Sequence, residues 1–237
     1  VTYILDTMPV RPGLLKGTPV VQVIVSDVTY MHSEICVAGW SLEEKRMVRP
    51  LSGPGCHWSP KLANPKMFQM GNVIEVTPTN MKNPRGLPHA HEDLIVEGTP
   101  KLLKTILESE VAAVLSDSES PSMAALFADN LQENRFVMRD SDCPSLGAIR
   151  VDCDSIQFFE ETWDDRVKLR CRLRDASGQW FNLPVVSVPL SDLHEDKGVR
   201  GLNALVKKHE AAHVRIGLAH PMENGRAFAM VNNMAFY

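Results

Sequence analysis

Hydrophobic and polar residues alternate over short stretches along most of the chain, a pattern that is typical of half-buried strands in antiparallel sheets. In the first half, strands are predicted at residues 20–25, on both sides of the polar stretch 41–45 within residues 34–51, and at residues 73–77 and 94–96. In the second half, strands are predicted at residues 147–151, 155–160, 166–174, 180–188, 214–218 and 227–231. The chain is therefore predicted to be mainly β, with a set of short strands in each half.

Three other segments fit helices better than strands. Apolar side chains recur every three or four positions in residues 101–115, which is the helical period. A short helix is expected at about residues 123–130, after a serine-rich run that can supply its N-cap, and another at about residues 198–211. The sequence thus predicts an α+β protein in which helices connect the small β modules.

The length of 237 residues suits two modules of about 100 residues each. Prolines and glycines interrupt the start of the chain, and the polar run at residues 116–122 separates the two sets of strands. We expect four segments along the chain: an irregular leader at residues 1–18, a first module at 19–115, a connector at 116–130 and a second module at 131–237.

Two sets of short strands, each with a helix near its end, suit a small closed barrel such as the OB-fold. Several segments resemble a family of bacterial proteins described as having dual OB domains, in the order expected for that family and over most of residues 20–233. These segments are CVAG at 36–39, VRPLS at 48–52, GNVIEV at 71–76, LPHAHED at 87–93, SLGAIR at 145–150, the hairpin at 169–184, IGLAHP at 216–221 and AMVNN at 229–233. The resemblance implies two small antiparallel OB-like barrels joined by a helical connector, and it implies no particular activity.

Composition limits where and how the protein can act. The formal net charge of −4 means that any nucleic acid must be held by a local basic patch. No apolar run approaches the roughly 18–20 residues of a membrane-spanning helix, and no basic region followed by a hydrophobic stretch begins the chain. The five cysteines are scattered and odd in number, which favours reduced thiols. We therefore expect a cytoplasmic protein with no membrane partner.

The most informative segment for function is RVKLRCRLR at residues 166–174. Because alternate side chains of a strand share a face, one surface is predicted to carry five cations: Arg166, Lys168, Arg170, Arg172 and Arg174. Trp180 and Phe181 follow a short turn and are predicted to add an aromatic platform. Single-stranded nucleic acid needs this combination, because cations hold phosphates and rings stack on bases.

A structural role would explain the same cations. Charged side chains keep the outer face of a strand in water and discourage pairing at sheet edges. Four acidic residues lie nearby in the sequence and could neutralise the patch: Glu160, Glu161, Asp164 and Asp165. In the first half, Trp40, Arg46 and Arg49 form a smaller candidate cluster, for which a solvated hairpin is the favoured interpretation.

Two groups of histidines could be interpreted as metal sites. His209, Glu210 and His213 fit the HExxH pattern of zinc hydrolases, in which two histidines one helical turn apart bind the metal. The third histidine, His220, follows His213 by seven positions instead of the six of extended zincin motifs, and the residues after His213 alternate like a strand. The other group has no finger-like or deaminase-like spacing, and consists of Cys56, His57, His89 and His91. The strand-like pattern weighs against a zinc site in the first group, and loop histidines in hydrogen-bond roles are the favoured interpretation of the second.

The sequence contains no phosphate-binding loop, dinucleotide fingerprint or nucleophile elbow, so no cofactor is predicted. We expect a non-enzymatic protein that binds nucleic acid, DNA or RNA and preferably single-stranded, through residues 166–174. Two alternatives stay open at this point. One is a protein-interaction adaptor whose basic strand meets an acidic partner. The other is a zinc-dependent hydrolase that uses the HExxH motif.

Overall fold

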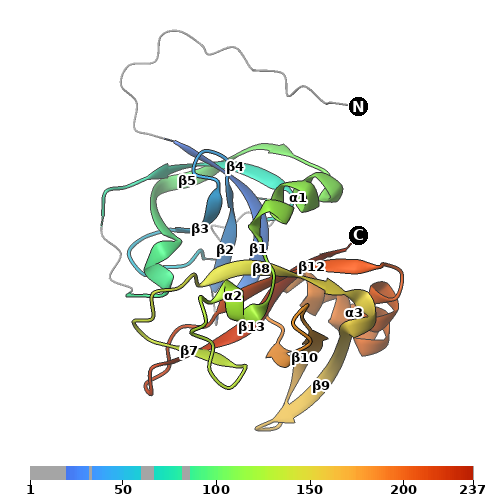
Figure 1. Cartoon of the computed structure of the whole chain (residues 1–237). Coiled ribbons are helices and arrows are strands. Elements are labelled where there is room, and N and C mark those ends of the chain that lie inside the picture. Colours follow the sequence, from blue (N-terminus) through green and yellow to red (C-terminus); the bar gives the residue numbers. More distant parts are fainter. Residues whose placement is uncertain (1–19, 32–33, 60–66, 82–85, 237) are drawn as a thin grey trace.

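The computed structural model describes residues 20–31, 34–59, 67–81 and 86–236. The leader predicted at residues 1–18 lies outside the described residues. Five strands of the first half close into a barrel in the order β1-β2-β3-β5-β4 (Figure 1). These strands are β1 (Val21–Met31), β2 (Glu34–Ser41), β3 (Arg46–Leu51), β4 (Asn72–Pro78) and β5 (Asp93–Thr105). All neighbours in the barrel are antiparallel except β3 and β5, which pair in parallel.

Valine and isoleucine side chains fill this barrel. Val23, Val25 and Ile74 are fully buried in its core, as expected of β-branched residues on a pleated surface. At Gly39 a side chain would collide with the carbonyl oxygen of Ile24 on β1, so the close approach of β1 and β2 requires glycine there.

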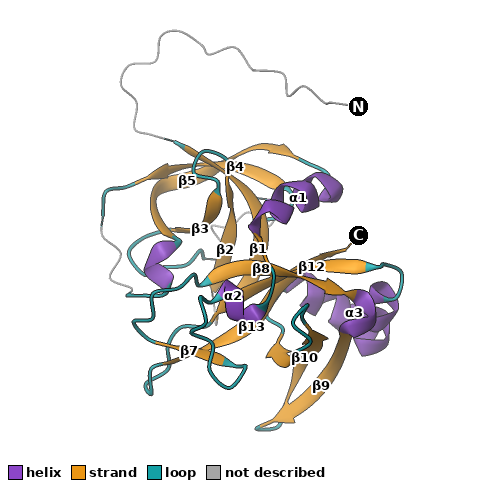
Figure 2. Ribbon diagram, viewed as in Figure 1, coloured by secondary structure: helices purple, strands orange, loops and turns teal. Residues whose placement is uncertain are grey.

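The second half contains two sheets, which Figure 2 shows below the first barrel in this view. One sheet has the order β11-β10-β9 and the other the order β6-β8-β12-β13-β7. The first three strands are β9 (Ile156–Trp163), β10 (Arg166–Arg174) and β11 (Trp180–Pro184). The others are β6 (Glu119–Ser120), β7 (Phe136–Met138), β8 (Leu146–Asp152), β12 (Ala211–Leu218) and β13 (Arg226–Phe236). Val185 and Val231 form one parallel bridge between the end of β11 and β13, so the two sheets are connected.

The helices are short, apart from the last. The α-helices are α1 (Glu108–Leu115), α2 (Met123–Leu126) and α3 (Val188–Val206), and the 3-10 turns are η1 (His89–His91), η2 (Ser116–Ser118) and η3 (Cys153–Ser155). Ser122 caps α2 through Ala125 N at 3.2 Å, and Ser187 caps α3 through Leu190 N at 3.3 Å. A mainly β architecture is therefore confirmed.

Two sequence predictions of helix position were wrong. Residues 101–105 belong to β5, because their backbone pairs with residues 72–75 of β4, and this pairing overrides the helical spacing of the leucines. The last helix starts at Val188, ten residues earlier than expected, and contains a kink at Gly198, whose φ of 62° is outside the helical region. Its end at Val206 also leaves residues 211–218 free to form β12.

The two halves share a buried boundary. Leu146 of β8 packs in one apolar cluster with Val111 and Leu115 of α1 and with Met47 of the first barrel. Asp27 of β1 and Arg215 of β12 form an ion pair of 3.2 Å, and each side chain is only 2% exposed. Because removing either charge would leave the other buried and unpaired, this pair fixes the halves against each other. None of the helices in the described part of the chain is long and apolar enough to cross a membrane.

Candidate nucleic-acid interface

The outer face of β9, β10 and β11 carries the basic strand. Leu169, Cys171 and Leu173 of β10 are buried. The alternate positions of the strand, which carry the five cations, therefore point outward. Four of these outward cations are exposed, namely Arg166, Lys168, Arg172 and Arg174. They share one face of β10, and the β9–β10 hairpin extends to the end of the molecule remote from the first barrel (Figure 1). Their role in binding stays a prediction.

Arg170, the middle cation of β10, is held within the protein. Its Nη2 donates a hydrogen bond of 3.0 Å to the carbonyl oxygen of Asn182, and its Nε lies 3.5 Å from Oε2 of Glu161. Its side chain is 17% exposed. Arg170 therefore fixes the positions of neighbouring strands and has less capacity than the other four cations for an external phosphate.

Trp180 lies beside the cations as the sequence suggested. It is 42% exposed and pairs with Arg174 across β10 and β11. The Arg172 guanidinium lies 4.6 Å from the centroid of the Trp180 ring, and that of Arg174 lies 5.5 Å from it. Cation–π attraction of this kind restrains the orientation of the Trp180 ring on the surface.

Phe181, in contrast, does not join the surface platform, and the sequence prediction of its exposure was wrong. It is 4% exposed and packs in the core of the second half, because successive side chains of β11 point to opposite faces. Sequence reasoning instead missed Trp163, which is 62% exposed and pairs with Arg166. The sequence did contain a signal for the exposure of Trp163, because this residue immediately precedes Asp164 and Asp165. These two residues have positive φ angles and form the hairpin turn.

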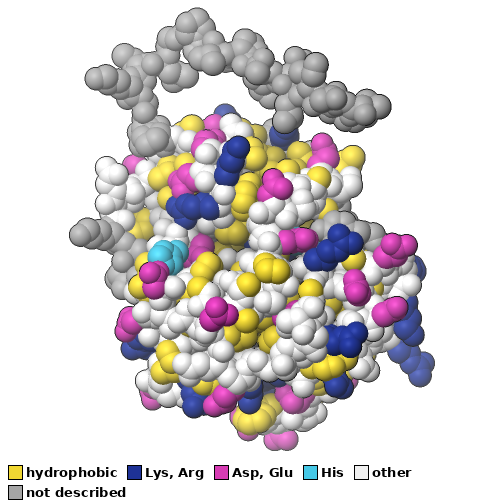
Figure 3. Space-filling model, viewed as in Figure 1, with side chains coloured by type: hydrophobic (Ala, Val, Ile, Leu, Met, Phe, Trp, Pro, Cys, Tyr) yellow, Lys and Arg dark blue, Asp and Glu magenta, His cyan; other side chains and the backbone are white. Residues whose placement is uncertain are grey.

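The nearby acidic residues neutralise the basic face only in part. Glu161 contacts Arg170, as described above, but Glu160 pairs with Leu169 and therefore points to the opposite face. There Glu160 binds His194 of α3 at 2.8 Å. Cations and anions are interspersed on the face of the molecule shown in Figure 3.

A trough crosses the outer face of these three strands, with a volume of about 420 Å³. It is lined by Phe159, Arg170 and Trp180 of these strands and by the turn at residues 133–135. We call this hollow the β-face trough. Its lining combines aromatic rings with two arginines and two glutamates, which suits a planar ligand that carries hydrogen-bonding groups.

In the smaller cluster of the first half, Arg49 does not reach the surface. Arg49 is 3% exposed and binds Asp93, while its Nη2 donates to Ser145 Oγ at 2.9 Å. Burial lowers the pKa of Arg49, but Cys36, Asp93 and Glu92 raise it by a larger amount, so its charge is retained. This arginine therefore connects the two halves and is unavailable to a ligand on the surface.

The other two members of that cluster are also engaged. Arg46 donates to the carbonyl oxygen of His91 at 2.6 Å and pairs with Glu44. Trp40 is half-buried against the apolar cluster at the boundary. Glu92 accepts two hydrogen bonds from Ser145, and burial raises its pKa despite the opposing effects of Arg49 and Ser145. Arg49 and Glu92 thus serve contact between the halves, while Arg46 is exposed and lines, with Trp40, a hollow of about 710 Å³.

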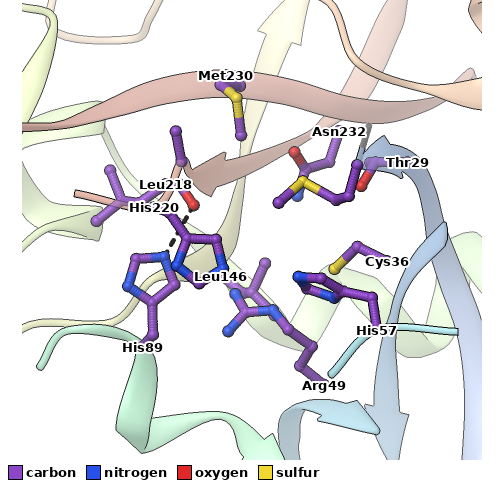
Figure 4. A pocket seen from close by; sticks show the side chains of 12 residues that line it. Thr29, Cys36, Arg49, His57, His89, Leu146, Leu218, His220, Met230 and Asn232 are labelled. Atoms are coloured by element: carbon purple, nitrogen blue, oxygen red, sulfur yellow. Dashed lines mark hydrogen bonds between the residues drawn. The ribbon is translucent and has the colours of Figure 1, made fainter. Parts of the chain in front are cut away.

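Three histidines meet in a small cavity at the boundary, as Figure 4 shows. The rings of His89 and His220 are parallel with centroids 5.2 Å apart, and His57 meets His220 edge-on at 5.8 Å. His89 Nε2 lies 3.1 Å from the carbonyl oxygen of Leu218. The cavity of about 30 Å³ has room for water but not for a nucleotide.

This arrangement differs from both histidine groups considered from the sequence. His91 points elsewhere and binds Asp142 at 2.7 Å, and Cys56 is exposed. Within the described residues, no three His, Cys, Asp or Glu side chains form a group that could hold a metal ion. The HExxH motif is not helical, since His213 lies in β12, and the zinc-hydrolase alternative was therefore wrong.

His213 has a structural environment. It is fully buried, and its Nδ1 lies 2.7 Å from Oε1 of Glu119. Burial and the adjacent Arg215 lower its pKa to about 4, against the opposing effect of Glu119. His209, at the other end of the motif, stacks on Phe236 with centroids 5.1 Å apart.

With this geometry established, the fold defines a mainly β protein with one closed five-stranded barrel. The chain belongs to the family described as the dual OB-containing domain, whose model matches residues 21–234. No curated protein matches the chain.

Two solved structures are similar over 94% of this chain and 96% of their own. One is described as the crystal structure of the tetrameric p202 HIN2, with 10% identity and a TM-score of 0.33. The other is described as the molecular basis for abrogation of activation of pro-inflammatory cytokines, with 11% identity and a TM-score of 0.35. Similarity at this level carries no functional argument.

Proposed function

We propose that this protein is a non-enzymatic, single-stranded nucleic-acid-binding protein that acts through the outer face of β9, β10 and β11. The observation that carries the proposal is the placement of four exposed cations on one face of β10, beside two exposed tryptophans. Trp163 pairs with Arg166 at one end of that strand, and Trp180 pairs with Arg174 at the other. Cations can follow a phosphate backbone between two rings on which bases stack.

The second half is proposed to be an OB barrel in its own right. Its β8 continues through η3 into β9, and β10 and β11 follow as the second and third strands. The parallel bridge of Val185 with Val231 corresponds to the parallel pairing of β3 with β5 in the first barrel. In OB-folds, strands two and three form the usual surface for oligonucleotides, which supports β10 and β11 as the binding face by analogy.

Single strands are favoured over duplexes for a steric reason. The ring of Trp180 must reach the flat face of a base, and base faces are covered by their neighbours in a duplex. The net charge of −4 also means that phosphates must be attracted by a local patch of cations, so binding should weaken strongly with salt. The scattered cysteines favour a reducing compartment, and we place the activity in the cytoplasm.

Fluorescence anisotropy with labelled single-stranded and duplex oligonucleotides, at low and moderate salt, tests this function. Lys168→Glu/Arg172→Glu should abolish binding, because both side chains are exposed on the proposed face. Lys101→Glu/Lys104→Glu makes the same change of charge on exposed positions of β5 and should retain most of the affinity. Absence of binding to the parent at low salt would reject nucleic-acid binding. Salt-insensitive capture of a single protein would support the adaptor function instead.

A further inference from the structure

We infer that the β-face trough holds one base of the bound strand and selects bases that carry an exocyclic amino group. This inference rests on the proposed function and specifies which single strands the same face prefers. The trough, of about 420 Å³, falls within the range of about 300–1,000 Å³ that is usual for small-molecule sites. It is therefore large enough for one base and its sugar.

The middle of the trough suits a planar ring. Phe159 of β9 is half-buried and Trp180 of β11 is partly exposed, and both line the hollow on either side of Arg170. Arg172 and Arg174 already lie over the ring of Trp180 and limit its movement. A base entering the trough would meet aromatic surface whose position is fixed before binding, which reduces the entropy lost on association.

Two carboxylates line the trough. Glu161 of β9 is 46% exposed in its side chain and lies 3.5 Å from Arg170 Nε. Glu133 lines the hollow from the turn at residues 133–135. An ionised carboxylate can accept hydrogen bonds but cannot donate them. The edge of a base that meets these side chains must therefore supply donors.

The turn that carries Glu133 is firmly held. Glu133 and Asn134 have φ angles of 50° and 55°, the left-handed conformation of a tight hairpin turn. Gln132 N donates to the carbonyl oxygen of Phe136 at 2.8 Å, and Ala229 N of β13 donates to that of Arg135 at 2.8 Å. The carboxylate of Glu133 is consequently presented from a fixed backbone, as a selective contact requires.

Cytosine, adenine and guanine carry exocyclic amino groups, whereas uracil and thymine present carbonyl oxygens on both sides of a single N–H group. Carbonyl oxygens facing a carboxylate are repelled and lose the hydrogen bonds that water gave them. Asn182, which also lines the trough, can donate or accept, and the guanidinium of the lining residue Arg135 is held over the ring of Phe228 at 5.9 Å from its centroid, so neither reverses this preference. The expected ligand is thus a single strand with an amino-bearing base at this position.

The test compares fluorescein-labelled decamers of deoxycytidine and deoxyuridine, whose bases differ at the C4 amino or carbonyl group. The parent should bind the deoxycytidine decamer about tenfold more tightly, the effect of one favourable hydrogen bond to a charged group. In Glu133→Gln/Glu161→Gln this ratio should fall toward one, because an amide can also donate to the uracil carbonyl. Glu97→Gln, an exposed position of β5, is the control and should keep the parent ratio.

Each outcome decides between the two proposals. Equal binding of both decamers by the parent would overturn the base selection and leave the proposed function intact. A ratio unchanged in the double variant would also overturn the role of the two carboxylates, provided that circular dichroism matches the parent. Failure of the parent to bind either decamer, or any other single strand, would reject the proposed function itself.

Discussion

Arg49 in the first barrel and Arg172 in the second half have opposite environments, although both lie in short strands with basic neighbours. Arg49 is buried at the boundary and bonded to Asp93 and Ser145. Arg172 is exposed and lies over the ring of Trp180. An arginine that is covered by the other half of the protein contributes to stability. An arginine on an exposed face of a sheet is available to a ligand. We therefore expect substitutions in the two regions to have separable effects on stability and on binding.

The largest effect is expected at the buried ion pair between the halves. Asp27→Asn should lower the free energy of unfolding by about 3–5 kcal/mol, because Arg215 would remain buried without its counter-charge. Urea denaturation followed by circular dichroism measures this change. Asp27→Leu/Arg215→Met should be more stable than the single variant, since no charge is left buried. A loss below about 1 kcal/mol in Asp27→Asn would contradict a structural role for the pair.

Acid should weaken the same boundary through His213. Because its folded pKa is lowered from 6.5 to about 4, the unfolded state binds a proton more readily between these values. Stability from this group is complete above pH 6.5 and is lost as the pH falls toward 4, by an amount on the order of 3 kcal/mol.

Free energies of unfolding at pH 7 and pH 4.5 measure this loss. The parent should lose more stability over this range than His213→Gln, in which the ionisable group is removed. Equal losses in the two proteins would show that His213 does not titrate in this way.

In the second half, substitution of an exposed residue on the proposed face should change the affinity for single strands and leave the free energy of unfolding nearly unchanged. Trp180→Ala should weaken the binding of single strands by about 1–3 kcal/mol, the usual contribution of one stacked base. Trp180→Phe keeps a ring and should retain a large part of the affinity. Anisotropy titration measures both, and an unchanged affinity in Trp180→Ala would remove this ring from the interface.

The smallest effect is expected on the exposed hairpin of the first barrel. Arg46→Ala should change the free energy of unfolding by less than about 1 kcal/mol, because its pair with Glu44 is exposed to solvent. It should also leave nucleic-acid affinity within about threefold of the parent. A larger loss of affinity than that caused by Arg172→Ala would reverse the proposed difference between the two regions.

The strands of this fold follow from local patterns, whereas several contacts between distant segments do not. Alternation along residues 168–174 correctly indicated which side chains are outside, because one face of that part of the strand is covered by apolar core, whereas Val167, on the predicted inner face, is 61% exposed. Residues 101–105 were misjudged because their strand pairing with β4 depends on a partner about 30 positions away. Long-range pairing of this kind leaves little trace in a local pattern.

The same limit applies to the candidate site. The sequence identified the basic residues, but not that Arg49 would be enclosed by Ser145 of the other half. It also grouped the histidines by spacing along the chain, whereas His57, His89 and His220 meet only when the halves pack together. Charge and periodicity thus predicted the exposed basic face of residues 166–174. The contacts between the halves determine which of the other candidate residues are accessible to a ligand.

The central claim is that single strands contact the second half and not the first. The four tryptophans divide between the two regions, with Trp163 and Trp180 exposed on the proposed face. Trp58 is buried and donates to the carbonyl oxygen of Pro50 at 2.8 Å, and Trp40 packs at the boundary. Their indole N–H groups therefore report on binding at each region separately.

The most direct measurement is an NMR titration of protein labelled with ¹⁵N-tryptophan, using a single-stranded decamer. The account predicts that the indole signals of Trp163 and Trp180 shift progressively while those of Trp40 and Trp58 stay in place. Shifts confined to Trp40 or Trp58, or no shift in any of the four at saturating decamer, would contradict it.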